Sequence, residues 1–324
     1  MAMEFLPYML AALVLSLVGT GLALRLLRKY RVMDTPNARS NHKAVTPRGG
    51  GIAMMAVSLP LLALYGMDWR IVAAALLLAG ISFVDDMRGL PARVRFLAQA
   101  IAVMIAIPVL HGRLLPDAVP QALEWIGLAL CWLWFINLTN FMDGIDGITS
   151  MQVVMMAVGI SVCVAIKPLL PLWLAGSCGI IAAAVLGFYW FNRSPAKLFM
   201  GDVGSIPLGF LMGYLLISLA LQGAWISALI LPAYYLGDAT FTLVKRGLRG
   251  EKVWEAHSQH AYQQAVRAGL SHRQVVEQIS LLNLLLISLA VLASIETMRM
   301  GLVMLFTAYA AVALTMRSLM RGKA

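Results

Sequence analysis

Residues 70–89 read RIVAAALLLAGISFVDDMRG, in which an uncharged apolar run (71–84) ends on two adjacent aspartates. A transmembrane helix needs about 20 mostly apolar residues, and this stretch supplies them if its charged end reaches the membrane surface. The stretch therefore predicts a span whose last turn presents Asp85 and Asp86 at the membrane boundary.

The rest of the chain repeats this apolar character, since 61% of its 324 residues are hydrophobic and 12% are charged. Soluble domains carry about twice that share of charge. Apolar runs fall near 3–24, 50–67, 70–84, 95–110, 122–139, 150–166, 169–190, 204–221, 224–244, 279–295 and 300–316. We predict an all-α, polytopic transmembrane helical bundle of about 11 spans, forming a single integral membrane domain over residues 1–324.

Lys and Arg concentrate at alternate ends of these spans. Twenty-one of the 25 lie in one set of links and in the tail, and the opposite side holds only Arg70, Arg113, Lys167 and Arg299. Because cytoplasmic loops collect Lys and Arg, we predict an outside N-terminus and a cytoplasmic C-terminus in a bacterial inner membrane. The net charge of +10 then reflects topology and attraction to anionic lipids and phosphates, and it does not indicate nucleic-acid binding.

The predicted cytoplasmic loops carry the polar residues of interest, near 28–49, 85–94, 140–149, 191–203 and 245–277. Asp85 and Asp86 end a helix, where the macrodipole disfavours anions, and adjacent carboxylates raise each other's pKa unless a cation intervenes. A solvated turn neutralised by Arg88 is the alternative interpretation. We favour a metal or phosphate-transfer site.

The segment N-L-T-N-F-M-D-G-I-D-G (137–147) is the most specific motif. Asn137, Asn140 and Asp143 are three residues apart and share one side of a helix end. Two ordinary Asp-Gly turns would explain the glycines but would not explain two asparagines at membrane depth. Polar groups in a membrane are usually functional, so the motif indicates a binding site that also includes Asp146.

A later motif, F-Y-W-F-N-R-S-P-A-K-L-F-M-G-D (188–202), contains Asn192, Phe199 and Asp202. Asp202 is either a functional carboxylate or the N-cap of the next span. Asp238 is a weaker candidate, because it could simply pair with Lys245 or Arg246.

Two basic loops are predicted on the same side. Lys43 and Arg48 precede a glycine run (49–51), a combination that suits phosphate oxygens. The second loop places His257 and His260 on one helical side, and we predict that it is mobile and binds phosphate. A solvated basic face is the alternative for this loop.

Together these motifs, from Asp34 to about His272, resemble the polyprenyl-phosphate N-acetylhexosamine-1-phosphate transferase superfamily (glycosyltransferase family 4). The resemblance implies a homodimer, a cytoplasmic cleft and Mg²⁺, with Mn²⁺ as the alternative ion. It implies Asp202 and Asp86 at the metal, and Asp85 and Asp86 as the catalytic pair. The implied nucleotide-sugar contacts are Asn140, Asp143, Asp146, Asn192 and Phe199, and Lys43 is implied beside the reacting phosphates. The residue pattern of the two basic loops adds Arg48, His257 and His260 as predicted phosphate contacts.

The chain departs from the muramyl-pentapeptide branch at Arg48-Gly49 and at H-S-Q-H-A-Y-Q (257–263). It is closer to the branch that initiates lipopolysaccharide O-antigen. The implied reaction moves an N-acetylhexosamine 1-phosphate from a UDP-sugar to undecaprenyl phosphate and releases UMP. Direct attack by the lipid phosphate and a covalent aspartyl intermediate both remain open, and we favour direct attack.

Two other classes share some of these features. An ion-coupled transporter is also rich in intramembrane acids, but it places them near the bilayer midplane in repeated halves. Here the acids cluster at one face, and the sequence shows no internal repeat. A CDP-alcohol phosphotransferase would need Ala-Arg after its Asp-Gly, which D-G-I-D-G-I-T-S (143–150) lacks.

Overall fold

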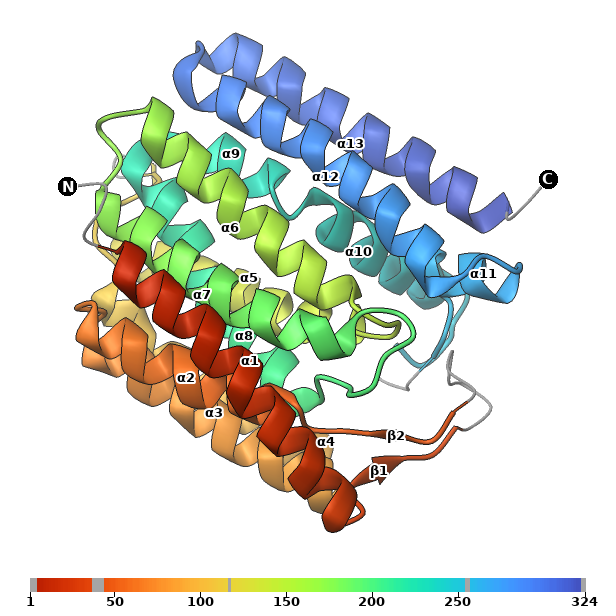
Figure 1. Cartoon of the computed structure of the whole chain (residues 1–324). Coiled ribbons are helices and arrows are strands. Elements are labelled where there is room, and N and C mark those ends of the chain that lie inside the picture. Colours follow the sequence, from red (N-terminus) through yellow and green to blue (C-terminus); the bar gives the residue numbers. More distant parts are fainter. Residues whose placement is uncertain (1–4, 37–43, 116–117, 254–256, 322–324) are drawn as a thin grey trace.

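The computed structural model describes residues 5–36, 44–115, 118–253 and 257–321, and over these residues the chain is a bundle of helices (Figure 1). Its α-helices are α1 (Leu6–Lys29), α2 (Gly51–Leu64), α3 (Trp69–Arg88), α4 (Ala92–Ala106), α5 (Gln121–Phe141), α6 (Ile148–Ile166), α7 (Leu172–Asn192), α8 (Asp202–Leu219), α9 (Trp225–Ile230), α10 (Ala233–Leu248), α11 (Ala261–Arg267), α12 (His272–Ile295) and α13 (Met298–Arg321). A 3-10 turn, η1 (Ile107–Val109), follows α4, and a π turn, η2 (Ala220–Ala224), follows α8. The prediction of an all-α fold is confirmed.

A short antiparallel hairpin interrupts the helices between α1 and α2. Strand β1 (Met33–Asp34) pairs with β2 (Thr46–Pro47), with Met33 opposite Pro47. The hairpin lies at the end of the bundle where α1 ends (Figure 1).

Eight helical segments in the described part of the chain are long and apolar enough to cross a membrane. They are α1, α4 with η1, α5, α6, α7, α8 through α9, α12 and α13. The other predicted runs fall on α2, α3 and α10, and of these α2 has only 14 residues. The predicted count of 11 spans and the predicted orientation of the termini are therefore not confirmed.

The run predicted over 224–244 is broken in the structure. Pro232, which has no backbone N–H to continue a helix, separates α9 from α10. The break leaves α10 as a separate helix with a polar buried side.

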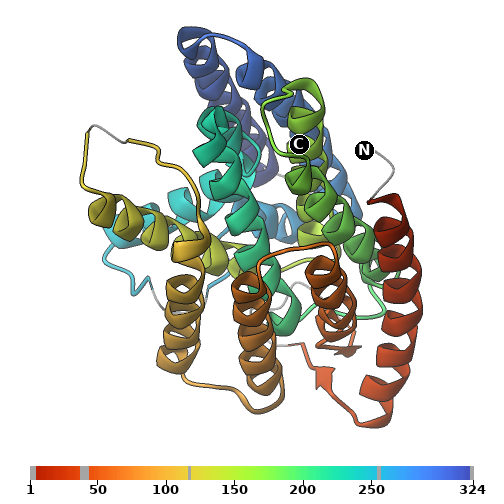
Figure 2. The same cartoon turned by 90° about the vertical axis from the view of Figure 1, so that its left-hand side faces the viewer.

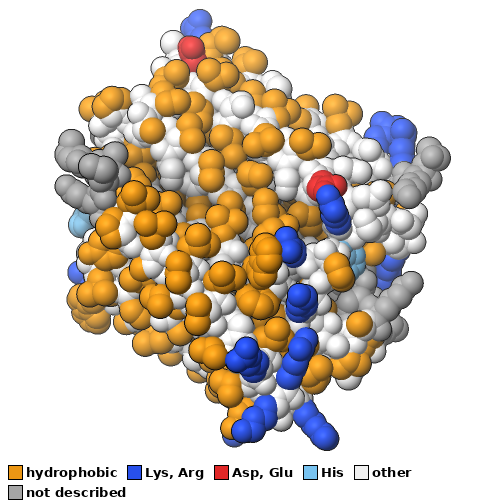
Figure 3. Space-filling view, viewed as in Figure 1, with side chains coloured by type: hydrophobic (Ala, Val, Ile, Leu, Met, Phe, Trp, Pro, Cys, Tyr) orange, Lys and Arg blue, Asp and Glu red, His pale blue; other side chains and the backbone are white. Residues whose placement is uncertain are grey.

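Helix α8 lies at the centre of the bundle, where α3 and α5 pack on it (Figure 2). The segment Asp202–Ile230 is 89% buried over its most apolar window, whereas α13 is 22% buried. The face seen in Figure 3 is broadly apolar, and Lys and Arg gather at the edge near the end of α1. This pattern fits a bundle whose outer helices face lipid.

Candidate functional site

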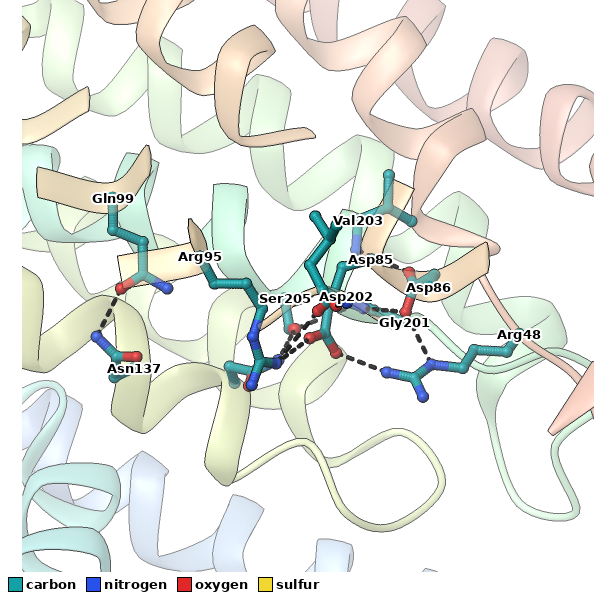
Figure 4. A network of polar contacts seen from close by, with 12 residues as sticks. Arg48, Asp85, Asp86, Arg95, Gln99, Asn137, Gly201, Asp202, Val203 and Ser205 are labelled. Atoms are coloured by element: carbon teal, nitrogen blue, oxygen red, sulfur yellow. Dashed lines mark hydrogen bonds and ion pairs between the residues drawn. The ribbon is translucent and has the colours of Figure 1, made fainter. Parts of the chain in front are cut away.

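Three predicted carboxylates come together at one end of the bundle (Figure 4). Arg48 bridges two of them, with Nε 2.8 Å from Asp86 Oδ1 and Nη2 2.7 Å from Asp202 Oδ1. Arg95 bridges a second pair, with Nη1 3.2 Å from Asp85 Oδ2 and 3.3 Å from Asp202 Oδ2. Motifs more than 100 residues apart in sequence thus form one cluster of three aspartates and two arginines.

The glycine run brings Arg48 to this cluster. The amides of Gly50 and Gly51 donate to the carbonyls of Phe199 and Met200, each at 2.9 Å. A Cβ on Gly51 would overlap the backbone of Gly204, so only glycine permits this approach. Backbone carbonyls thus occupy these two amides, and the predicted contact of this loop with phosphate stays a prediction.

Asp86 also fixes the start of α8. Its Oδ1 accepts the Asp202 amide at 3.1 Å and its Oδ2 accepts the Val203 amide at 3.0 Å. A carboxylate is unfavourable at the end of α3 but favourable at the positive N-terminus of another helix. The adverse position of Asp86 in α3 is thereby compensated by α8.

These contacts test the two alternative interpretations of the aspartates, a solvated turn neutralised by Arg88 and an N-cap formed by Asp202. The cations in contact with the Asp85–Asp86 pair are Arg48 and Arg95, which come from other segments, and not Arg88. Asp202 is the first residue of α8, after Gly201 as N-cap, and the side chain that caps the helix is that of Asp86.

The asparagines of the 137–147 motif contact different helices. Asn137 Nδ2 donates to Gln99 Oε1 at 2.7 Å on α4, whereas Asn140 Nδ2 donates to Ser205 Oγ at 2.9 Å on α8. Because Ser205 lies one helical turn after Asp202 in α8, Asn140 contacts the first turn of that helix. The two asparagines thus contact different neighbours, and their predicted part in a binding site stays a prediction.

Asp143 lies beyond the end of α5, on the loop that leads into α6. Burial raises the pKa of this carboxyl to about 7, although a hydrogen bond from Thr149 acts in the opposite direction. Asp202 adds to the rise through charge repulsion. Asp143 is therefore an aspartate whose charge responds to neutral pH and to any cation nearby.

Asp146 and Asn192 hold the loop between α7 and α8. Asp146 Oδ2 accepts the Ala196 amide at 3.1 Å and lies 3.2 Å from His272 Nδ1. Burial opposes its charge, but His272 and the Ala196 amide hold the pKa of Asp146 below its usual value. Asn192 is buried, accepts from Ser150 and donates to the Leu198 carbonyl.

A polar cleft of about 520 Å³ opens beside Asp146. It is lined from α7, the 193–197 loop and α12 by residues that include Arg193, Lys197 and Arg273. Arg193 stacks on the Trp190 ring, with its guanidinium carbon 3.9 Å from the ring centroid. The lining also includes Asp146 and Glu277, and Arg273 pairs with Glu277 at 2.7 Å. The cations left for an anionic ligand are therefore Arg193 and Lys197 among the lining residues.

The second basic loop differs from its prediction. His257 and His260 precede α11 and are not on a helix, although their rings lie 4.8 Å apart. His260 is buried, and its Nδ1 lies 3.4 Å from Asp238. Burial, with His260 and Arg246 nearby, lowers the pKa of His257 to about 4, so this imidazole is neutral at pH 7.

The remaining predicted residues fall outside this cluster or outside the described chain. Lys43 lies outside the described residues. Phe199 is half-buried, and its amide donates to the Pro47 carbonyl at 2.8 Å. Asp238, which the alternative paired with Lys245 or Arg246, accepts the Ala261 amide at 2.9 Å, and Arg246 pairs with Glu251 at 2.8 Å.

Sequence reasoning missed Arg95 and His272. Arg95 lies in the first turn of α4. It could have been inferred from charge, because three clustered carboxylates need more positive charge than Arg48 alone supplies. His272 is the first residue of α12, after Ser271 as N-cap, and its Nδ1 lies 3.2 Å from Asp146 Oδ2. No sequence spacing links either residue to its partner.

The site fits a magnesium ion only together with a substrate. Over the described residues, no three His, Cys, Asp or Glu side chains converge to hold an ion on their own. Mg²⁺ usually takes one or two protein carboxylates and completes its shell with water and substrate phosphates. Asp86 and Asp202, which converge on Arg48, supply such a pair of oxygen donors.

Comparisons with known proteins point to one family. The sequence model of "Glycosyl transferase family 4" matches residues 69–220, which run from α3 into η2 and include every site aspartate named above except Asp238. The chain is 26% identical to a "Probable undecaprenyl-phosphate N-acetylglucosaminyl 1-phosphate transferase" of Bacillus subtilis, over 92% of this chain and 87% of that one.

It is 28% identical to a "Decaprenyl-phosphate N-acetylglucosaminephosphotransferase" of Mycobacterium leprae, over 82% of this chain and 78% of that one. A protein of the same name in Mycolicibacterium smegmatis is 27% identical, over 82% and 76%. None of these matches distinguishes the O-antigen branch from the muramyl branch. Together they show that this chain is similar to glycosyl transferase family 4 over residues 69–220 and to polyprenyl-phosphate N-acetylglucosamine-phosphate transferases over most of its length.

Proposed function

We propose that this protein transfers an N-acetylhexosamine 1-phosphate from a UDP-sugar to undecaprenyl phosphate. The observation that carries the proposal is the cluster of Asp85, Asp86 and Asp202 with Arg48 and Arg95 at one end of an apolar bundle. The names of the relatives support N-acetylglucosamine as the sugar. An ion-coupled transporter is not favoured, because the carboxylates meet at one end and not midway along the helices.

In the proposed reaction, an oxygen of the lipid phosphate attacks the phosphorus that carries the sugar. A new P–O bond forms, the bond from that phosphorus to the bridging oxygen breaks, and UMP leaves with that oxygen. Such transfers depend on positioning and on neutralising the charge of the phosphates. Arg48 and Arg95 are placed to supply part of that charge.

Roles follow for the remaining residues. Asp86 and Asp202 would hold Mg²⁺, which would supply positive charge to the diphosphate. Asp85 would form the catalytic pair with Asp86. Asn140, Asp143, Asp146, Asn192 and Phe199 would bind the nucleotide-sugar. The cationic cleft beside Asp146 supports an anionic ligand on this side. Lys43 and His257 remain proposed phosphate contacts.

The proposed setting is a bacterial inner membrane, with the site facing the cytoplasm. The support is the sequence count of Lys and Arg, which favours that side. Initiation of O-antigen or a related surface polysaccharide by a homodimer completes the proposal. Single cysteines at Ser40 and Asp117 test the orientation, because only Asp117→Cys should label with an impermeant thiol reagent in intact cells.

The deciding experiment measures UMP release by the purified protein with undecaprenyl phosphate, Mg²⁺ and a panel of UDP-sugars. We expect release with UDP-N-acetylglucosamine and no release when the lipid phosphate is omitted. Absence of release with every sugar, under conditions where the Bacillus subtilis relative is active, would refute the proposal.

A further inference from the structure

Helix α10 carries a polar stripe on its buried side. Tyr235, Asp238, Thr242 and Arg246 recur at intervals of three and four residues and are all buried, so they share one face of the helix. Asp238 is 0% exposed. A buried carboxylate is costly unless neighbouring groups satisfy it, so its partners indicate what it holds in place.

The partners of Asp238 belong largely to the start of α11. Its Oδ1 accepts the Ala261 amide at 2.9 Å, and its Oδ2 accepts the Tyr262 amide at 3.4 Å. Tyr234 and Thr242 on its own helix each donate to it at 3.2 Å. Asp238 therefore fixes where α11 begins and how its side chains are aimed.

Tyr262 connects this anchor to the predicted site. The ring is fully buried, and its hydroxyl donates to the Phe141 carbonyl at 3.1 Å, at the end of α5. A Cβ on Gly144 would overlap the same hydroxyl. Tyr262 thus contacts the loop on both sides of Asp143.

A second route from α10 reaches the start of α6. The Tyr235 and Thr149 hydroxyls are 2.9 Å apart, and Thr149 is the second residue of α6, directly after the loop that carries Asp143. Both routes begin on one face of α10, and they end within that loop and just after it.

We propose that Tyr235, Asp238 and Tyr262 are positioning residues, which hold Asp143 in the orientation needed to bind the nucleotide-sugar. The functional half of this inference rests on the proposed function. The structural half, that these side chains hold the 141–147 loop, stands without it. Asp238 then acts through the loop and does not contact the substrate.

The test uses Tyr262→Phe and Tyr235→Phe, each of which removes one hydroxyl and keeps the ring. We expect faster amide hydrogen exchange across residues 141–147 in both variants, because Tyr262→Phe removes a hydrogen bond to the loop and Tyr235→Phe removes one to Thr149 directly after it. The KM for the UDP-sugar should rise about fivefold, the effect of one net hydrogen bond, with less than about twofold change in kcat. The KM for the lipid phosphate should stay unchanged.

Tyr214→Phe is the matched control, since this tyrosine is also buried but lies within α8, where its ring stacks on Trp132. It should leave exchange in 141–147 and the donor KM as in the wild type. The rise in donor KM for Asp238→Asn combined with Tyr262→Phe should be smaller than the two single effects added as free energies, because both changes act through α11.

Wild-type exchange in 141–147 for both tyrosine variants would overturn the scaffold. Faster exchange with an unchanged donor KM would overturn its role in donor binding. If the wild-type protein transfers no sugar phosphate at all, the proposed function fails, and the exchange measurement alone decides whether the scaffold exists.

Discussion

Arg48 ion-pairs with two carboxylates at once, so its replacement should lower both stability and activity. Arg48→Ala leaves Asp86, whose side chain is 1% exposed, and Asp202, at 10%, without their common cation. Both carboxylates stay partly satisfied, because Asp86 still accepts two amides and Asp202 still contacts Arg95.

The size of the loss follows from these contacts. Removing one partner of a buried ion pair costs about 3–5 kcal/mol. Arg48 is 38% exposed, so water screens its charge, and the remaining partners of the aspartates recover part of the loss. We therefore expect Arg48→Ala to lower the free energy of unfolding by about 1–3 kcal/mol.

The assay is unfolding of the purified protein in detergent, with UMP release measured on the same samples. Arg48→Lys is the matched variant, since it keeps the charge but lacks the planar fork that meets two carboxylates; its stability should fall between those of the wild type and the alanine variant. A double-mutant cycle with Asp86→Asn should show coupling of about 1 kcal/mol.

The reasoning would be refuted by an Arg48→Ala protein within about 0.5 kcal/mol of the wild type whose effect simply adds to that of Asp86→Asn. Such a result would mean that Arg48 does not hold the two carboxylates together in solution.

Four further substitutions and one metal-removal experiment test other parts of the site. Asp202→Asn should abolish transfer while the protein stays folded, and excess EDTA should do the same to the wild type; full activity in EDTA would exclude Mg²⁺. His260→Ala should destabilise the protein by about 1–3 kcal/mol, because His260 contacts the buried Asp238, whereas His257→Ala should reduce turnover without changing stability. Asp143 has a raised pKa, so its stabilising contribution is present near pH 4 and lost as the pH approaches 7. In unfolding experiments, Asp143→Asn should therefore be more stable than the wild type at pH 8 but not at pH 4.

Much of the helical layout was predictable from sequence. Each predicted apolar run falls on a helix, because hydrophobic length is read directly along the chain. The break at Pro232 was missed, since residues 224–244 are apolar throughout and a proline alone does not show whether a membrane helix bends or ends.

The candidate site was predictable in its residue types but not in its pairings. Asp85, Asp86 and Asp202 were identified as one group, yet nothing in sequence joins Arg48 to Asp202, 154 residues away. That pairing depends on the close approach of Gly51 to Gly204. The burial of His260 was also missed, because its partner Asp238 lies 22 positions earlier, on α10, and no sequence spacing links the two residues.

The contact between Asp86 and the start of α8 also limits how a substrate can bind. The N-terminus of a helix is a ready-made anion site, but here a carboxylate of the protein already occupies the amides of Asp202 and Val203. The Asp86 carboxylate therefore occupies the amides that a phosphate approaching α8 would otherwise contact. A phosphate group at this end of α8 would therefore meet the side chains of Arg48 and Arg95 rather than the first two amides of the helix.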